Sequence, residues 1–86
     1  MKRPSLGVCG ASTADPALAA LAERLGAEAW HVGFDLVCGG LGGVMEAAAR
    51  GYATARGSGT GVVIGILPGL DRRAANPHCD VIIPTG

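Results

Sequence analysis

The sequence has few aromatic and few charged residues, and it has no long hydrophobic run. Aromatic side chains make up 3% of its 86 residues and charged side chains 16%, with seven basic residues against seven acidic ones. A balanced charge without a basic cluster argues against a nucleic-acid-binding face. No apolar run approaches the roughly 18 residues of a membrane span, and no signal peptide follows the first residues. We therefore expect a cytoplasmic protein with neither a membrane segment nor a nucleic-acid partner.

Cysteine and histidine are also scarce. Cys9, Cys38 and Cys79 are an odd number and form no C-x-x-C pair. This pattern is typical of small buried hydrophobic residues in a reducing compartment. The alternative is that Cys9 and Cys38, which end two neighbouring predicted strands, line one site. His31 and His78 lack a carboxylate partner at metal-ligand spacing, so we predict neither a metal site nor a catalytic residue in this chain.

The composition is rich in small apolar residues. Hydrophobic residues make up 49% of the chain, and fifteen glycines stand beside fifteen alanines. This excludes a disordered chain and favours close packing of backbones over a core of large side chains. A chain of this length buries only about 60–65% of its unfolded surface, so a partner subunit or a cofactor is expected to contribute to stability.

The hydrophobic pattern alternates between short apolar runs and helical repeats. Strands are predicted at 5–9, 35–38, 61–67 and 80–84, and helices from 16 to about 31–33 and from 42 to 54. Asp15 followed by Pro16 is a typical helix start. Gly26 inside the first helix predicts a tight packing contact, because glycine weakens a helix by about 1 kcal/mol. Glu46 and Arg50 are spaced to pair on the outer face of the second helix.

This order of elements predicts an α/β fold. Strands that alternate with helices form parallel β-α-β units with right-handed crossovers. We expect a Rossmann-like parallel sheet with flanking helices, in a single domain over residues 1–86. In such sheets the first strand is central and has neighbours on both sides. Residues 1–86 supply strands for only one side, so strand 5–9 should keep an open edge. A typical domain has about 100–150 residues, and this chain is expected to be the N-terminal half of one.

Two turns are candidates for phosphate binding. In residues 36–46 a short apolar strand leads into four glycines within five residues and then into a helix. Glycines permit a tight turn and close approach of a ligand, and the N–H groups and dipole of the helix start attract an anion. The first turn contains Gly10, Ser12 and Thr13, whose hydroxyls and backbone could also hold a phosphate. The alternative for Ser12 and Thr13 is capping of the first helix.

The glycine turn does not carry a dinucleotide fingerprint. Met45 stands where G-x-G-x-x-G needs its third glycine, and the strand ends in Cys38-Gly39-Gly40 without the acidic residue that binds ribose hydroxyls. These two departures argue against an ordinary dehydrogenase. A further glycine-rich stretch, residues 57–61, precedes a strand instead of following one, so we interpret it as a flexible connection.

Three motifs in order point to a known family. Cys-Gly-Gly-Leu-Gly-Gly-Val-Met-Glu-Ala-Ala at 38–48 is followed by Gly51 and by Val-Ile-Gly-Ile-Leu-Pro at 63–68, and Val-Cys-Gly-Ala-Ser opens the chain at 8–12. Together they resemble the Lonely Guy/lysine-decarboxylase-like (SLOG) family of Rossmann-type proteins. The tail at 76–86 is most similar to the subgroup related to molybdenum-cofactor carrier proteins.

The resemblance implies a phosphate-binding face at the ends of the first two strands. With Thr13 added from the chemistry of the first turn, the implied binding residues are Gly10, Ser12, Thr13, Gly39, Gly40, Gly42, Gly43 and Met45. The ligand would be a phosphorylated small molecule, either a nucleotide or a molybdopterin-type cofactor.

Two alternatives remain. Hydrolases of this family cleave nucleoside 5′-monophosphates at the N-glycosidic bond, with an arginine and a glutamate in motifs that residues 1–86 do not contain. Enzymatic activity therefore stays open. The second alternative is a non-catalytic half-domain that is completed by oligomerisation, most simply as a homo-oligomer.

Overall fold

A computed structural model of the chain describes residues 3–9, 15–39, 42–67, 69, 71, 73 and 75–85. The elements are β1 (Ser5–Val8), α1 (Pro16–His31), β2 (Asp35–Cys38), α2 (Val44–Arg56), β3 (Val63–Leu67) and β4 (Val81–Pro84). Their order is the predicted one. The main shift is in α2, which was expected to begin at Gly42. Gly43 has a φ of 66°, outside the right-handed helical region, so the helix cannot begin before Val44.

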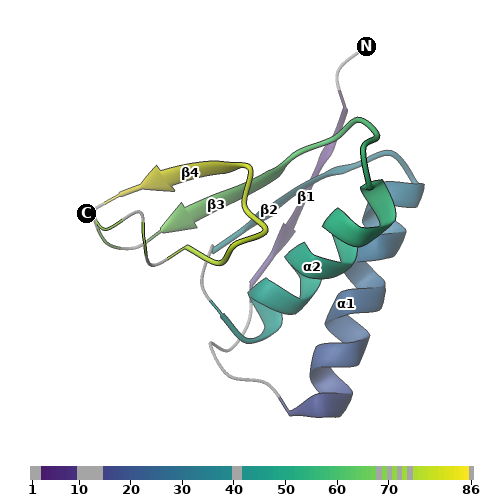
Figure 1. Ribbon diagram of the computed structural model, residues 1–86, viewed down its shortest axis with the longest axis horizontal. Coiled ribbons are helices and arrows are strands. Elements are labelled where there is room, and N and C mark those ends of the chain that lie inside the picture. The colour runs from purple at the N-terminus through teal and green to yellow at the C-terminus, as the bar shows by residue number, and fades with distance from the viewer. Residues whose placement is uncertain are drawn as a thin grey trace.

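The four strands form one parallel sheet in the order β1-β2-β3-β4 (Figure 1). Val8 is opposite Cys38 in the register of β1 and β2, and Cys38 is opposite Gly65 in the register of β2 and β3. The predicted α/β, Rossmann-like fold is confirmed. Among the described strands β1 pairs only with β2, so its other edge is open as expected.

Both helices cover the same face of the sheet (Figure 1). The core lies between them and the strands, and its largest fully buried side chains are Leu36, Tyr52, Val63 and Leu67. The Tyr52 hydroxyl donates a 2.6 Å hydrogen bond to the carbonyl of Phe34, which satisfies its polar atom inside the core. Parallel connections of one hand place successive helices on one side of a sheet, and that explains the two-layer arrangement.

The two helices approach each other through glycines. A Cβ atom built on Gly26 would overlap the backbone carbonyl of Ala48, and one built on Gly51 would overlap the carbonyl of Glu23. The predicted tight contact at Gly26 is confirmed. The predicted Glu46–Arg50 pair is wrong, because Arg50 Nε lies 3.1 Å from Glu23 Oε2 across the helix interface.

The apolar residues of α1 lie on two different faces of the helix. Its small residues Ala22, Gly26 and Ala29 are buried, whereas its leucines at 18, 21 and 25 are 42–61% exposed. On the face of the sheet opposite the helices, Ile66, Val81 and Ile83 are also 42–45% exposed. The part of the chain that the structure describes therefore exposes apolar side chains both on α1 and on the sheet face opposite the helices. In that part, neither helix combines the length and the apolar character that crossing a membrane requires.

Candidate ligand-binding site

The carboxyl ends of β1 and β2 lie side by side, as the Val8–Cys38 register shows. In open α/β sheets this edge is where ligands bind. Four of the predicted binding residues, Gly39, Gly42, Gly43 and Met45, follow β2 at this edge or open α2. The other four predicted residues, which are Gly10, Ser12, Thr13 and Gly40, lie outside the described residues.

The amino end of α2 begins at a glycine. Gly43 is the N-cap residue, with φ 66° and ψ −129°, and over the described residues no side-chain hydrogen bond caps this helix end. The Gly43 carbonyl accepts the first helical bond, from Ala47 N at 3.0 Å. A glycine N-cap thus supplies none of the side-chain acceptors that Ser, Thr or Asp would offer to the N–H groups of the first turn. Glu46 adds a negative charge to the same turn, so an anion would have to bind on the side of the turn away from that carboxylate.

The amino end of α1 is different. The Asp15 carboxylate accepts a 2.8 Å hydrogen bond from Leu18 N, and Pro16 is the first helical residue. The predicted start of α1 is confirmed. Because this helix end already has a negatively charged acceptor, α2 offers the better anion site of the two.

Met45 lies beneath the glycine turn. It is 7% exposed, and its sulfur occupies the space that a Cβ on Gly39 would need. The thioether thus contacts the turn from the core side, where it positions Gly39. A ligand would approach Gly39 from the opposite side, through backbone groups.

The cysteines differ in their surroundings. Cys38 is buried as predicted, Cys79 is half-buried, and Cys9 is exposed, contrary to the prediction. Cys9 lies one residue beyond β1, and side chains alternate between faces along a strand. Cys9 and Cys38 border the same cavity, of about 270 Å³, near Gly39. Burial raises the pKa of Cys79 to about 11, with a further contribution from neighbouring Cys38, so the thiol stays protonated and is a poor nucleophile at neutral pH.

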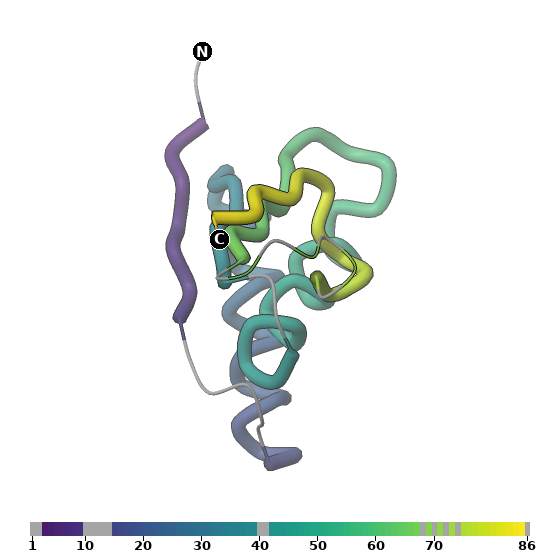
Figure 2. Tube along the Cα trace, turned by 90° about the vertical axis from the view of Figure 1, so that its left-hand side faces the viewer, coloured from purple at the N-terminus to yellow at the C-terminus, as the bar shows by residue number. Residues whose placement is uncertain are grey.

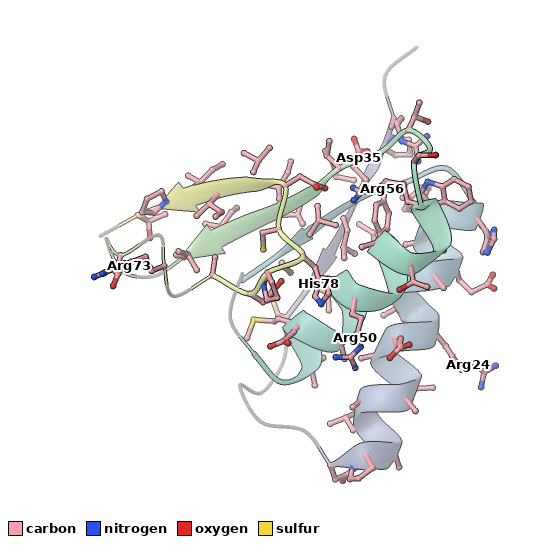
Figure 3. The ribbon with its side chains drawn as sticks, in the orientation of Figure 1. Arg24, Asp35, Arg50, Arg56, Arg73 and His78 are labelled. Atoms are coloured by element: carbon pink, nitrogen blue, oxygen red, sulfur yellow. The ribbon has the colours of Figure 1, made fainter. Side chains whose placement is uncertain are left out.

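Charged side chains gather at the opposite edge of the sheet, near the amino ends of the strands (Figure 3). Asp35 Oδ1 lies 3.1 Å from both Arg3 Nε and Val62 N. Asp80 is paired with Arg56 and accepts a hydrogen bond from the backbone of Val63. These contacts tie the strand starts together and lie away from the candidate site. Neither aspartate was predicted to make these contacts, although each stands at the start of a predicted strand.

Two other predicted features lie outside this site. The glycine-rich connection 57–61 is at the charged edge, where Trp30 Nε1 donates a 2.8 Å hydrogen bond to Thr60 O. His31 is exposed and stacks edge-on against Trp30, with ring centroids 5.2 Å apart. Over the described residues, no three His, Cys, Asp or Glu side chains are grouped as a metal site would need.

The sequence and the fold are similar to those of known proteins. The model of the SLOG cluster4 family matches residues 3–86. The chain belongs to the SLOG cluster4 family. An uncharacterised protein from Archaeoglobus fulgidus is 40% identical over 85 residues, which are 99% of this chain and 53% of that protein.

Two solved structures are similar over the whole SLOG chain. The molybdenum cofactor binding protein from Rippkaea orientalis has 35% identity and a TM-score of 0.88, with 100% of this chain and 52% of that one covered. The molybdenum cofactor carrier protein from Chlamydomonas reinhardtii has 31% identity and a TM-score of 0.80, with 99% and 51% covered. The resemblance to the carrier-like subgroup is confirmed. This chain spans about half the length of these relatives.

Proposed function

We propose that this SLOG protein binds a phosphate-containing small molecule at the turn between β2 and α2. The observation that carries the proposal is the uncapped amino end of α2, which starts at a glycine directly behind the carboxyl edge of the sheet. An uncapped helix start at this position offers N–H donors and a positive dipole end to an anion. The names of the Rippkaea and Chlamydomonas proteins support a cofactor as the ligand.

The binding groups would be backbone N–H groups. Gly39, Gly42 and Gly43 present no side chain, so a phosphate can approach the main chain closely. Met45 would hold the turn from below through its contact with Gly39. Gly40, and Gly10, Ser12 and Thr13 of the first turn, belong to the same proposal, because they stand in the two turns after β1 and β2.

The two ligand classes share a phosphate group. A nucleotide and a molybdopterin-type cofactor could both place it at the helix start, and likeness to molybdenum cofactor proteins favours the second. Hydrolysis of nucleoside 5′-monophosphates stays a prediction, since no described contact favours it. Binding by backbone groups needs no catalytic side chain.

Titration calorimetry tests the site. Adenosine monophosphate, inorganic phosphate and isolated molybdenum cofactor are each titrated into the wild-type chain and into Gly42→Asp. The new carboxylate at the turn should repel the phosphate and weaken binding by about tenfold or more, equivalent to about 1.4 kcal/mol. The matched variant Ser58→Asp adds the same charge in the exposed connection before β3 and should leave affinity unchanged.

Each result decides one part of the proposal. If folded Gly42→Asp binds as tightly as the wild type, the ligand does not lie at this turn. If the wild-type chain binds none of the three ligands, the proposed function is wrong for this chain. Circular dichroism of both variants shows whether a loss of binding reflects a loss of fold.

A further inference from the structure

Cys38 and Cys79 lie together on the helical side of the sheet. Cys38 ends β2, belongs to the buried core and shares its face with Val8, the residue opposite it in the register. Cys79 stands just before β4 and packs against the same core. Figure 2 shows the segment before β4 close to α2, on that side of the sheet. The two thiols are in hydrogen-bond contact.

A glycine on β3 leaves space for this contact. Gly65 lies between β2 and β4 in the register, opposite Cys38 on one side and Ile82 on the other. It alternates with the buried Val63 and Leu67, so a side chain at this position would project to the helical face beside Cys38. Without that side chain, the segment before β4 can approach the end of β2.

Asn76 positions Cys79. Its Oδ1 atom accepts hydrogen bonds from His78 N at 3.0 Å and from Cys79 Sγ at 3.6 Å. The Asn76 carbonyl also accepts a hydrogen bond from Cys79 N at 3.4 Å, and Asn76 is only 6% exposed. The turn before β4 is thus held by one buried residue. Two groups that are fixed beside each other react with a large effective concentration.

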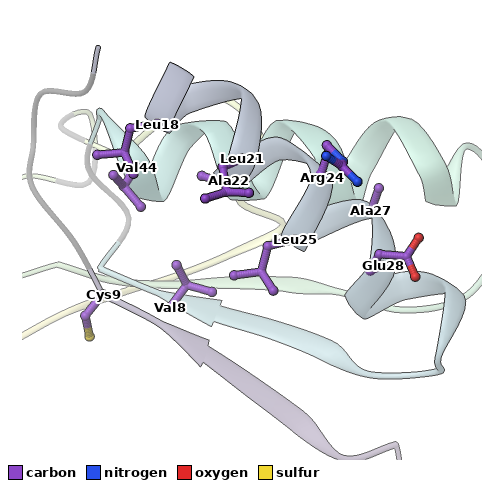
Figure 4. Close-up of a pocket in the computed structure, with 10 residues that line it drawn as sticks. All are labelled: Val8, Cys9, Leu18, Leu21, Ala22, Arg24, Leu25, Ala27, Glu28 and Val44. Atoms are coloured by element: carbon purple, nitrogen blue, oxygen red, sulfur yellow. The ribbon is translucent and has the colours of Figure 1, made fainter. Parts of the chain in front are cut away.

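Cys9 lies on the other face of the sheet. It is exposed, and Figure 4 shows its side chain pointing away from α1, whereas Val8 points toward the helix. Because Val8 and Cys38 share a face, the Cys9 thiol is separated from the Cys38 thiol by the sheet. Among the three cysteines, Cys38 and Cys79 are therefore the pair placed for reaction with each other.

We propose that Cys38 and Cys79 are an oxidation site, which a small organic disulfide such as oxidised glutathione converts to an intrachain disulfide. First, the thiolate of the less buried Cys79 attacks one sulfur of the small disulfide and expels the other as a thiolate. The Cys38 thiolate then attacks the Cys79 sulfur of the mixed disulfide and expels the second thiolate. The two cysteines lose two electrons and two protons, and the small disulfide becomes two thiols.

Burial affects both the formation and the reduction of this disulfide. Burial, the neighbouring Cys38 and the Asp80 carboxylate raise the pKa of Cys79 to about 11, so about one thiol in ten thousand is ionised at pH 7. Exchange is therefore slow at neutral pH and faster in alkaline solution. A strongly oxidising disulfide needs a stabilised thiolate in its reduced form. Cys79 has no such stabilisation, so the disulfide should resist reduction once it has formed.

The disulfide would join two parts of the fold that are distant in sequence. It links the end of β2, directly before Gly39, to the segment before β4. A cross-link of this kind restricts the unfolded chain and so stabilises the folded one. We expect oxidation to raise the melting temperature by about 5–15 °C.

Peptide mapping tests the oxidation site. The folded wild-type chain is reduced, freed of reductant and incubated with excess oxidised glutathione at about pH 9, where more of the thiol is ionised. The remaining thiols are blocked with N-ethylmaleimide. Trypsin then cleaves after Arg24, Arg50 and Arg73, which places the three cysteines in separate peptides. Mass spectrometry should show peptide 25–50 linked to peptide 74–86.

Two serine variants are the controls. Cys9→Ser keeps the pair, so it should give the same linked peptide and the same rise in melting temperature as the wild type. Cys79→Ser removes one partner, so oxidised glutathione should neither link the peptides nor raise its melting temperature. Circular dichroism shows whether each variant is folded before treatment.

Three outcomes would overturn the proposal. The first is that neither the folded wild type nor Cys9→Ser yields the linked peptide. The second is a link that forms only after urea has unfolded the chain, because the two sulfurs would then meet only in the unfolded state. The third is a wild-type disulfide in which Cys9 is one of the two partners.

Discussion

At the scale of single residues, Asp80 shows how one carboxylate organises its surroundings. Its Oδ2 atom accepts a 2.7 Å hydrogen bond from Val63 N, and it forms an ion pair with Arg56. Burial raises the pKa of Asp80, but the hydrogen bonds from Arg56 and Val63 together outweigh burial and leave the pKa below its ordinary value. Asp80 thus holds the end of α2, the start of β3 and the start of β4 together in its charged form.

Stability should therefore depend on the charge of Asp80. A carboxyl whose pKa is lower in the folded state stabilises the fold above its unfolded pKa, about 3.9, and loses this effect as the pH falls through the folded value. Asp80→Asn should lower the melting temperature at pH 7, and the difference from wild type should shrink below about pH 4. Thermal unfolding followed by circular dichroism at pH 7, 5 and 3 measures both.

Asp71→Asn is the matched control. Arg73 also lowers the pKa of Asp71, but the two residues are exposed and only two positions apart, so they can pair in the unfolded chain as well. Little change in melting temperature is expected. A gap between Asp80→Asn and wild type that is constant from pH 7 to pH 3 would mean that packing, and not charge, accounts for it.

At the scale of elements, the contact between α1 and α2 depends on the absence of two side chains. Gly26 and Gly51 each face a backbone carbonyl of the other helix, with no space for a Cβ atom. The Arg50–Glu23 pair then spans the two helices near this contact. The helices are therefore closer than side chains of ordinary size would allow.

Gly26→Ala should destabilise the protein despite the better helix propensity of alanine. Propensity would favour the change by about 1 kcal/mol, but the new methyl group would overlap the Ala48 carbonyl, and overpacking costs about 1–3 kcal/mol or more. We expect a net loss of about 1–2 kcal/mol in the free energy of unfolding, measured by urea denaturation. Gly7→Ala, where a Cβ meets no atom within 4 Å, should change stability much less. An increase in stability for Gly26→Ala would contradict the close helix contact.

At the scale of the whole molecule, the sheet is covered on one face only in the described part of the chain. The exposed isoleucines and valine on the second face of the sheet form a surface that soluble monomers normally cover. The chain is also small for a stable domain. The exposed sheet face and the small size agree with the finding that this chain matches only about half the length of each relative.

The bare face should bind a hydrophobic dye. We expect the chain alone to increase the fluorescence of 8-anilinonaphthalene-1-sulfonate, and the double variant Ile66→Thr, Ile83→Thr to reduce the increase by about half, because it removes apolar surface. Val32→Thr, at an exposed residue away from this face, serves as the control. Equal dye fluorescence from the wild type and the double variant would mean that the face is not accessible.

Much of the fold was readable from the sequence because it depends on local signals. The order of strands and helices follows from hydrophobic spacing, and the start of α1 follows from Asp15 and Pro16. The parallel sheet with β1 at its edge follows from the alternation of elements. The glycine turn could be placed at the carboxyl edge for the same reason. These features need only neighbours in the chain and the handedness of the backbone.

Tertiary structure decided which side chains meet. The leucine stripe of α1 could have been its buried face by spacing alone, but the close contact through Gly26 selects the alanine side and leaves the leucines outside. Arg50 binds Glu23 rather than Glu46, and Met45 lies under Gly39. The glycine turn could thus be predicted from residues adjacent in the sequence. The packing of Met45 against Gly39 could not, because it depends on how the strand and the helix are placed in space.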